Sequence, residues 1–251
     1  MKATTLFLFA ALGFIFSCKK SSSSDVNLNS GLIAYYPFNG NANDASGNNL
    51  NGEINGGVTF SNDISGNANS AATFNGTDGY IRIPDNTGKF QTGEVSVSLL
   101  VNLTTNSNPF ALIEDVNFNN ATGLGWGVGA SETDNAKFEF AVTPNSLGCN
   151  QYISNPGYLT TSTSEFSTGK WYSLVGVFSD STQKFYVNGS LNASLKRNFS
   201  TLNQCSANQG IAIGAWWASD IASPNGTLDE IRIYNRALNQ DEINELAKLV
   251  K

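Results

Sequence analysis

The sequence predicts an all-β protein in which two antiparallel sheets pack into a sandwich and one short helix ends the chain. About ten short segments alternate apolar and polar residues, as strands with one buried face do. Turn residues separate these segments at intervals of ~8–12 residues. Only 14% of the residues are charged and 24 are glycines, a composition that favours a turn-rich β protein. One large sandwich can account for the folded part of the chain.

The expected strands follow one another without a visible break between domains. The clearest strand covers residues 94–103, where Val95 and Val97 begin an apolar face and serines begin the opposite face. Residues 38–52 are mostly Asn, Asp, Gly and Ser, so they form a loop. Residues 146–166 lack a strong period, and a loop of that length is usually functional or locally pinned. The other strands are expected at residues 32–36, 58–60, 71–74, 80–83, 110–113, 126–130, 138–142, 171–179, 184–187 and 211–213, with a last strand around Asp229.

The helix is predicted directly after that last strand. Asn239 is its N-cap, and Glu242, three residues later, completes a capping box. The buried stripe of the helix is expected at Ile243, Leu246, Ala247 and Val250.

The first residues are expected to be a secretory signal, residues 1–17, and not part of the fold. Lys2 precedes an apolar run over residues 6–16 that is too short to span a bilayer comfortably. The run ends in Ser17 and Cys18, which resembles the cleavage site of a bacterial lipoprotein, where the cysteine becomes lipid-modified. The alternative is an ordinary signal peptide with a chance cysteine.

Residues 18–30 then form a lipidated cysteine and a polar tether, and residues 31–251 form the folded domain. The mature protein is therefore expected to be exported and to meet the bacterial outer membrane only through its lipid, on the periplasmic or the cell-surface side.

Composition excludes several kinds of chemistry. The chain has no histidine, so His-based triads, His general bases and most zinc sites are ruled out. A net charge of −6 and a pI of about 4.6 disfavour nucleic acid as a partner. Once Cys18 is assigned to lipid, Cys149 and Cys205 remain, and in an exported protein they most simply form a disulfide. Two free thiols in a reducing compartment are the alternative.

Four stretches of the chain carry a family resemblance. They read YYPFNGNANDASGNNLNG, AATFNGTDGYIRIPD, KWYSLVGVFSD…KFYVNGSL and GTLDEIRIYNRALNQDEI, in that order. Over residues 31–250 the chain is similar to the laminin G-like, concanavalin A-like jelly-roll modules of bacterial surface proteins. The resemblance implies a jelly-roll sandwich, but the superfamily includes lectin modules, adhesion modules and glycan hydrolases. Its glucanase branch carries Glu-x-Asp-x-x-Glu on one strand, which this sequence lacks.

The resemblance also implies a structural calcium between the early polar loop and the late Asp-Glu strand. In this sequence its ligands are Asp44 and Asp229, with further oxygens from Asn39, Asn41 or Gly47. Calcium takes 6–8 oxygen ligands from carboxylates and from the carbonyls of irregular loops, which these segments supply.

Alternation gives independent support for a cation at Asp229. It places Asp229 on the same face of its strand as Ile231 and Ile233, where an unpaired carboxylate is costly. The alternative is that Asp229 caps a turn and that Asp44 makes an Asx turn.

Aromatic residues beside amide-rich loops are the candidates for ligand binding. A flat ring covers the apolar face of a sugar, and amides satisfy its hydroxyls. Trp216 and Trp217 are adjacent, so they point to opposite faces in a strand, and Trp217 is favoured for exposure. Tyr152, Asn150 and Gln151 lie in the long loop and are further candidates. Core packing is the alternative role for these rings.

The sequence therefore predicts a monomeric, lipid-anchored, non-catalytic module that binds an extracellular glycan. A protein-binding adhesion module is the first alternative, and a glycan hydrolase with an unrecognised acid pair is the second. The adjacent pairs Glu114-Asp115 and Asp229-Glu230 point to opposite faces of their strands, so neither pair alone can flank a scissile bond.

Overall fold

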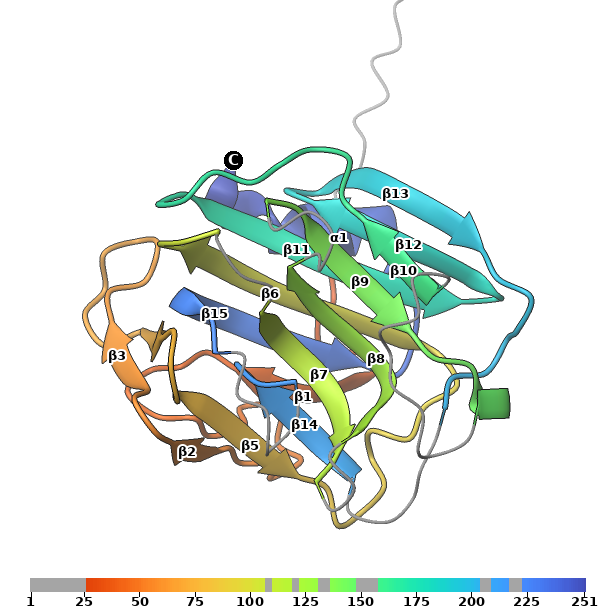
Figure 1. Ribbon diagram of the computed structural model, residues 1–251, viewed down its shortest axis with the longest axis horizontal. Helices are drawn as coiled ribbons and strands as arrows, with labels where there is room; N and C mark the ends of the chain where they lie inside the picture. The colour runs from red at the N-terminus through yellow and green to blue at the C-terminus, as the bar shows by residue number, and fades with distance from the viewer. Residues whose placement is uncertain are drawn as a thin grey trace, which may run out of the picture.

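The protein is a sandwich of two antiparallel sheets (Figure 1), as the sequence predicts. The structure is a computed structural model, and it describes residues 26–106, 110–118, 122–130, 136–147, 158–203, 209–216 and 223–251.

Sheet A has eight strands, seven of them in the order β13-β12-β11-β6-β15-β4-β3, with β1 paired to β15 outside that path. Its strands are β1 (Leu32–Tyr36), β3 (Thr59–Ser61), β4 (Ala71–Asn75), β6 (Val95–Leu103), β11 (Trp171–Ser179), β12 (Thr182–Val187), β13 (Ser190–Lys196) and β15 (Asn225–Tyr234).

Sheet B has seven strands in the order β10-β9-β8-β7-β14-β5-β2. Its strands are β2 (Glu53–Asn55), β5 (Tyr80–Pro84), β7 (Ala111–Asn117), β8 (Thr122–Ala130), β9 (Phe138–Val142), β10 (Leu159–Thr161) and β14 (Gln209–Ile213). A 3-10 helix (Asn145–Leu147) follows β9, and β10 lies within the long loop that the sequence predicts at residues 146–166.

The main core lies between the sheets. Val97 and Leu99 of β6 in sheet A meet Ile211 and Ile213 of β14 in sheet B, and Trp126 of β8 is buried among them. Trp126 is 1% exposed, so this tryptophan stabilises the fold and is not a surface ligand contact. On β14, Ala212 lies between the two core isoleucines, so alternation turns it away from the core.

The helix α1 (Gln240–Leu246) covers the outer face of sheet A (Figure 1) and is shorter than predicted. Its capping box is confirmed: Asn239 Oδ1 accepts hydrogen bonds from the Asp241 and Glu242 amides, and the Asn239 amide donates to Glu242 Oε2 at 2.8 Å. A 3-10 turn (Lys248–Val250) follows. No helix among the described residues is long and apolar enough to cross a membrane.

A second apolar cluster seals α1 to sheet A. Val175 and Val177 of β11 pack with Ile243 and Leu246 of the helix. Strand β6 is consequently buried on both faces, although the sequence predicts a polar outer face for it. Ser96 on that face is satisfied without water, because its hydroxyl donates to the Arg236 carbonyl at 2.7 Å and accepts from the Leu238 amide at 3.0 Å. These bonds fix the chain that leads into the helix.

Candidate functional site

A row of residues in register crosses the outer face of sheet B from one edge to the other. Ala212 fixes the side of the sheet on which the row lies, because its neighbours Ile211 and Ile213 face the core. In order from β2 to β10 the row is Glu53, Arg82, Ala212, Glu114, Gly127, Ala141 and Leu159.

Small residues surround Glu114 in the middle of this row. Ala212 precedes it on β14, and Gly127 follows it on β8. A Cβ atom added to Gly127 would lie 3.2 Å from Cγ of Glu114, so the glutamate side chain extends over the bare backbone of β8. Any side chain at position 127 would compete with Glu114 for this space.

The Trp216 ring lies close to β8 at Gly129, two residues after Gly127. A Cβ atom on Gly129 would lie 3.5 Å from Cη2 of the Trp216 indole and 2.6 Å from the Phe110 carbonyl oxygen. Gly129 is in register with Glu139 on β9, so a second carboxyl group borders β8 from the other side. We call Glu114, Gly127, Gly129, Glu139 and Trp216 together the β8 site.

Glu114 is the most unusual group of the β8 site. It is 2% exposed, and its Oε2 makes no hydrogen bond to the described residues. Burial, followed by the charge of Asp115, raises the pKa of Glu114 well above its usual range. Asp115 itself faces the other way, in register with Ile211, and its Oδ2 accepts a hydrogen bond from the Gly125 amide at 3.1 Å. Burial therefore favours the neutral form of the Glu114 carboxyl group.

The structure describes only some of the residues that the sequence nominates for binding. Trp216 is partly exposed and lies at the β8 site, and its role as a ligand contact stays a prediction. The remaining candidates, together with the predicted disulfide and lipidation sites, lie outside the described residues. They are Trp217, Tyr152, Asn150, Gln151, Cys149, Cys205 and Cys18.

Sequence reasoning missed Glu139 and the importance of Glu114. The two glutamates are 25 positions apart, and only the pairing of β7, β8 and β9 brings them to one face. The signal that could have indicated the site is the segment TGLGWGVGA, residues 122–130, in which every second residue is glycine. A strand with glycine on one whole face usually accommodates a close neighbour or a ligand there.

Hydrogen bonds from its own loop surround the carboxylate of Asp44, which the sequence predicts as a calcium ligand. Its Oδ1 accepts hydrogen bonds from the Tyr35 and Ser46 amides, and its Oδ2 accepts from the Ser46 hydroxyl and the Leu50 amide. Burial raises the pKa of Asp44, but these hydrogen bonds outweigh it and hold the pKa below its usual value. Since a carboxylate offers about four lone pairs, Asp44 has none left for a cation in this arrangement. Asp44 forms the Asx turn that the sequence offers as the alternative to a calcium ligand.

The other predicted calcium ligands of this loop take part in its internal hydrogen bonds and turns. The Asn41 side chain donates to the Asn39 carbonyl at 3.0 Å and accepts from the Asn43 amide at 2.9 Å. Gly47 adopts a φ of +90°, a left-handed turn conformation that glycine adopts without strain.

Asp229 is not on the core face of β15 where alternation places it. Glu230 has a φ of +53° and forms a bulge, which shifts the register between Asp229 and Arg232. Leu228 and Ile231 therefore both belong to the core, and Asp229 is in register with Leu100 and not with the core residue Leu99. The prediction that Asp229 shares a face with Ile231 is wrong, because a bulge adds one residue and inverts the alternation.

Asp229 is nevertheless buried, at 3% exposure, in acidic surroundings. Its Oδ1 accepts a hydrogen bond from the Glu230 amide at 2.7 Å. Burial, then the charge of Glu230, and further the charge of Asp63 raise the pKa of Asp229 to about 8. Arg232 is committed elsewhere, to Glu230 at 2.7 Å. No group of three or more Asp, Glu, Cys or His side chains with metal-site geometry occurs among the described residues.

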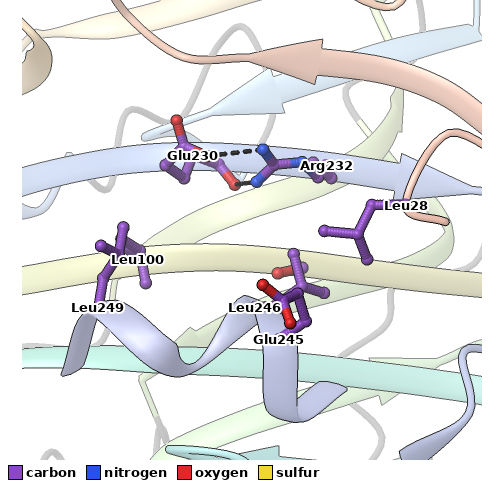
Figure 2. A pocket seen from close by; sticks show the side chains of 8 residues that line it. Leu28, Leu100, Glu230, Arg232, Glu245, Leu246 and Leu249 are labelled. Atoms are coloured by element: carbon purple, nitrogen blue, oxygen red, sulfur yellow. Dashed lines mark hydrogen bonds and ion pairs between the residues drawn. The ribbon is translucent and has the colours of Figure 1, made fainter. Parts of the chain in front are cut away.

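A separate hollow of about 110 Å³ lies on the outer face of sheet A. Figure 2 shows the Glu230–Arg232 ion pair beside leucines that come from the N-terminal segment, β6 and the C-terminal helical turns. Tyr35 binds this ion pair: its hydroxyl donates to Glu230 Oε1 at 2.8 Å, and the centre of its ring lies 3.9 Å from the Arg232 guanidinium. These polar groups satisfy one another, so the hollow presents no unpaired charge of this trio to a ligand.

A family model matches most of the chain. Residues 75–244 match the family model described as the concanavalin A-like lectin/glucanases superfamily. The chain belongs to this superfamily. The match covers β5 to α1 and includes every residue of the β8 site. Comparison with curated protein sequences finds no match.

Solved structures of other proteins share the architecture. One is domain 4 of AbnA, an extracellular GH43 arabinanase from Geobacillus stearothermophilus, in complex with arabinotriose; the TM-score is 0.61 at 23% identity, over 86% of this chain and 98% of that chain. Another is the binding domain of botulinum neurotoxin DC in complex with rat synaptotagmin II, with a TM-score of 0.62 at 15% identity over 90% of this chain. The same neurotoxin domain in complex with SialylT has a TM-score of 0.63 at 14% identity, over 89% of this chain.

These identities establish a shared fold and nothing finer. The chain spans about half of the neurotoxin binding-domain structures, 52–53% of their length.

The buried acid of the β8 site makes stability depend on pH. Glu114 ionises at its ordinary pKa in the unfolded chain and at a raised pKa in the folded chain, so the free energy of unfolding falls as pH rises above ~4.5 towards the folded pKa. Glu114→Gln removes this titration. We expect the free energy of unfolding of the variant to match that of the wild type at pH 4 and to exceed it at pH 8, measured by urea unfolding at both pH values.

The exposed Glu165 offers a matched control. Glu165→Gln is expected to leave the pH dependence as it is in the wild type. Parallel wild-type and Glu114→Gln curves from pH 4 to pH 8 would show that Glu114 is ionised in the folded protein.

Proposed function

We propose that the chain is an exported module that binds carbohydrate at the β8 site without cleaving it. The observation that supports this most strongly is that an indole ring and two carboxyl groups border one face of β8, on which Gly127 and Gly129 carry no side chains. An aromatic ring offers an apolar platform to a sugar ring. Carboxyl groups hydrogen-bond the hydroxyls of a sugar. The arabinotriose complex of the AbnA domain gives a precedent for carbohydrate on this fold.

The start of the domain is compatible with an anchor on the opposite side. Leu28 and Leu32 pack against the apolar cluster under α1, on the outer face of sheet A. The chain therefore enters the fold on the face away from the β8 site.

A glycan hydrolase is the second candidate, because Glu114 and Glu139 flank β8 on one face. With strands ~4.8 Å apart, their Cα atoms are separated laterally by ~10 Å, and catalytic carboxyl pairs lie ~5–10 Å apart. Release of reducing ends from any bound oligosaccharide would favour this candidate over simple binding.

Trp216 provides the direct test of the binding proposal. Trp216→Ala removes the platform, so we expect at least a tenfold rise in Kd, about 1.4 kcal/mol, for oligosaccharides selected on a glycan array and measured by calorimetry. The matched control is Trp171→Ala, because Trp171 lies at the start of β11 on sheet A. If the wild type binds no glycan and captures proteins instead, the adhesion alternative replaces this proposal.

We further propose that calcium binds at Asp229 and not at Asp44. A buried carboxylate with neighbouring acids is costly in its ionised form, and a divalent cation removes that cost. Asp229 can offer a carboxylate to the cation, and the charge of Asp63 reaches it from the loop between β3 and β4. Calcium binds the ionised form, so its stabilising effect grows as pH rises towards and through 8, the pKa of Asp229.

Thermal unfolding with and without a chelator tests the cation. At pH 7.5 we expect calcium to raise the melting temperature of the wild type by several degrees, and Asp229→Asn to abolish that rise. Asp44→Asn is the comparison: it loses part of the loop's hydrogen bonding, so its melting temperature falls equally with calcium and with chelator. A wild-type melting temperature that the chelator leaves unchanged would refute calcium binding.

A further inference from the structure

A buried glutamine joins the two sheets at one edge of the sandwich. Gln183 of β12 is in register with the core residue Phe178 of β11, so its side chain points from sheet A towards sheet B, and it is fully buried. Its Nε2 donates hydrogen bonds to the Phe140 carbonyl oxygen of β9 at 2.6 Å and to the Tyr158 carbonyl oxygen at 3.3 Å. A buried amide is costly unless its hydrogen bonds are made, so this side chain fixes β12 to the edge of sheet B.

Arg197 extends this connection from the end of β13. Its Nε donates to Gln183 Oε1 at 2.6 Å, and its Nη2 donates to the Leu159 carbonyl oxygen of β10 at 3.1 Å. Its backbone amide donates to the Ser181 carbonyl oxygen at 2.7 Å. Because the donors of a guanidinium form a rigid fork, Arg197 holds the glutamine and the edge strand β10 at the same time. We call Gln183 and Arg197 the latch.

The chain after β13 crosses from sheet A to sheet B at this edge. Residues 197–203 contain no strand or helix, and we call them the strap. The Phe199 ring of the strap stacks on Phe178 of sheet A, with 5.4 Å between the ring centres. The same ring meets the Tyr158 ring, just before β10, edge-on at 5.8 Å. One aromatic side chain of the strap therefore touches both sheets.

The far end of the strap pairs with the chain that follows β9. Leu202 is 2% exposed and forms an isolated bridge with Pro144. Beside this bridge the Asn203 amide donates to the Thr143 carbonyl oxygen at 2.8 Å. The strap is thus fastened at its start by the latch and at its end by a short backbone bridge.

These fastenings differ in kind from those of the neighbouring strands. Strand β11 is paired along most of its length with β6 on one side and with β12 on the other. The strap has only two apolar side chains, Phe199 and Leu202, and its first contacts are polar groups that water can also satisfy. Segments that release little apolar surface on opening do so at a lower free energy than the whole domain.

We propose that the latch closes the strap over this edge, and that the strap and β10 open together as one local unit while the rest of the sandwich stays folded. β10 is the last strand of sheet B, and an edge strand offers unpaired backbone groups to other chains. Gln183 and Arg197 occupy carbonyl oxygens at this edge, so the closed latch also protects it.

Hydrogen exchange followed by mass spectrometry on the purified full chain tests this device. In the wild type, the amides of residues 197–203 and 158–163 are expected to exchange faster than those of β6 and β11. Arg197→Met removes the guanidinium and keeps an apolar stem. We expect it to raise exchange in both segments by ~10-fold, as the loss of one or two hydrogen bonds would, and to leave β6 and β11 unchanged.

Two further variants complete the test. Arg197→Lys keeps a donor at this position, so its exchange is expected to lie between the wild type and Arg197→Met. Arg82→Met is the matched control, because Arg82 also reaches a neighbouring edge strand, at Glu53 of β2, but on the opposite edge of sheet B. It is expected to leave both segments at wild-type exchange rates.

Three results would overturn the proposal. The first is an equal rise across β6 and β11 in Arg197→Met, because the latch would then act only on global unfolding. The second is faster exchange of the strap with residues 158–163 unchanged, because the two would not open together. The third is a wild type in which both segments exchange as slowly as β6. If Arg197→Met does not fold, Arg197→Lys and the wild-type pattern decide the matter.

Discussion

The missing side chains on the outer face of β8 are the constraint on which the β8 site depends. Gly127 and Gly129 leave the backbone of this strand bare, and the Glu114 and Trp216 side chains occupy the space that Cβ atoms would fill. Pairing with β7 and β9 then places carboxyl groups on both borders of the strand. A Cβ atom at position 129 would collide with the Phe110 carbonyl oxygen, at 2.6 Å. The site therefore depends on sheet register and on two glycines, and Trp216 joins it from the segment that follows β14.

The opposite face of the sandwich is arranged for stability. The helix α1 is fixed by its capping box and by an ion pair in which Arg236 Nη2 lies 2.6 Å from Glu242 Oε1. Ser96 holds the segment before the helix, and a second apolar cluster lies beneath it. The bulge at Glu230 belongs to the same region and turns Asp229 away from the core.

Local signals in the sequence predict most of the fold. The apolar core face of β6 and the Asn239 capping box depend on residues close together in the sequence, and the structure confirms both. The polar outer face predicted for β6 is buried, because the helix that covers it comes from the end of the chain. The direction of Asp229 could not be predicted, because a bulge depends on how β15 pairs with β6 and not on the residues of β15 alone. The β8 site is non-local in the same sense. Glu114 and Glu139 reach one face only through a third strand, and no local pattern reveals the burial that raises the pKa of Glu114.

A structure of the protein with a bound oligosaccharide tests the central claim most directly. The ligand should be selected by array binding, and a crystal of the complex should show it. We predict that a sugar ring lies against the Trp216 indole. A saccharide bound in the hollow on sheet A, or elsewhere on the sandwich away from Trp216, would contradict this account.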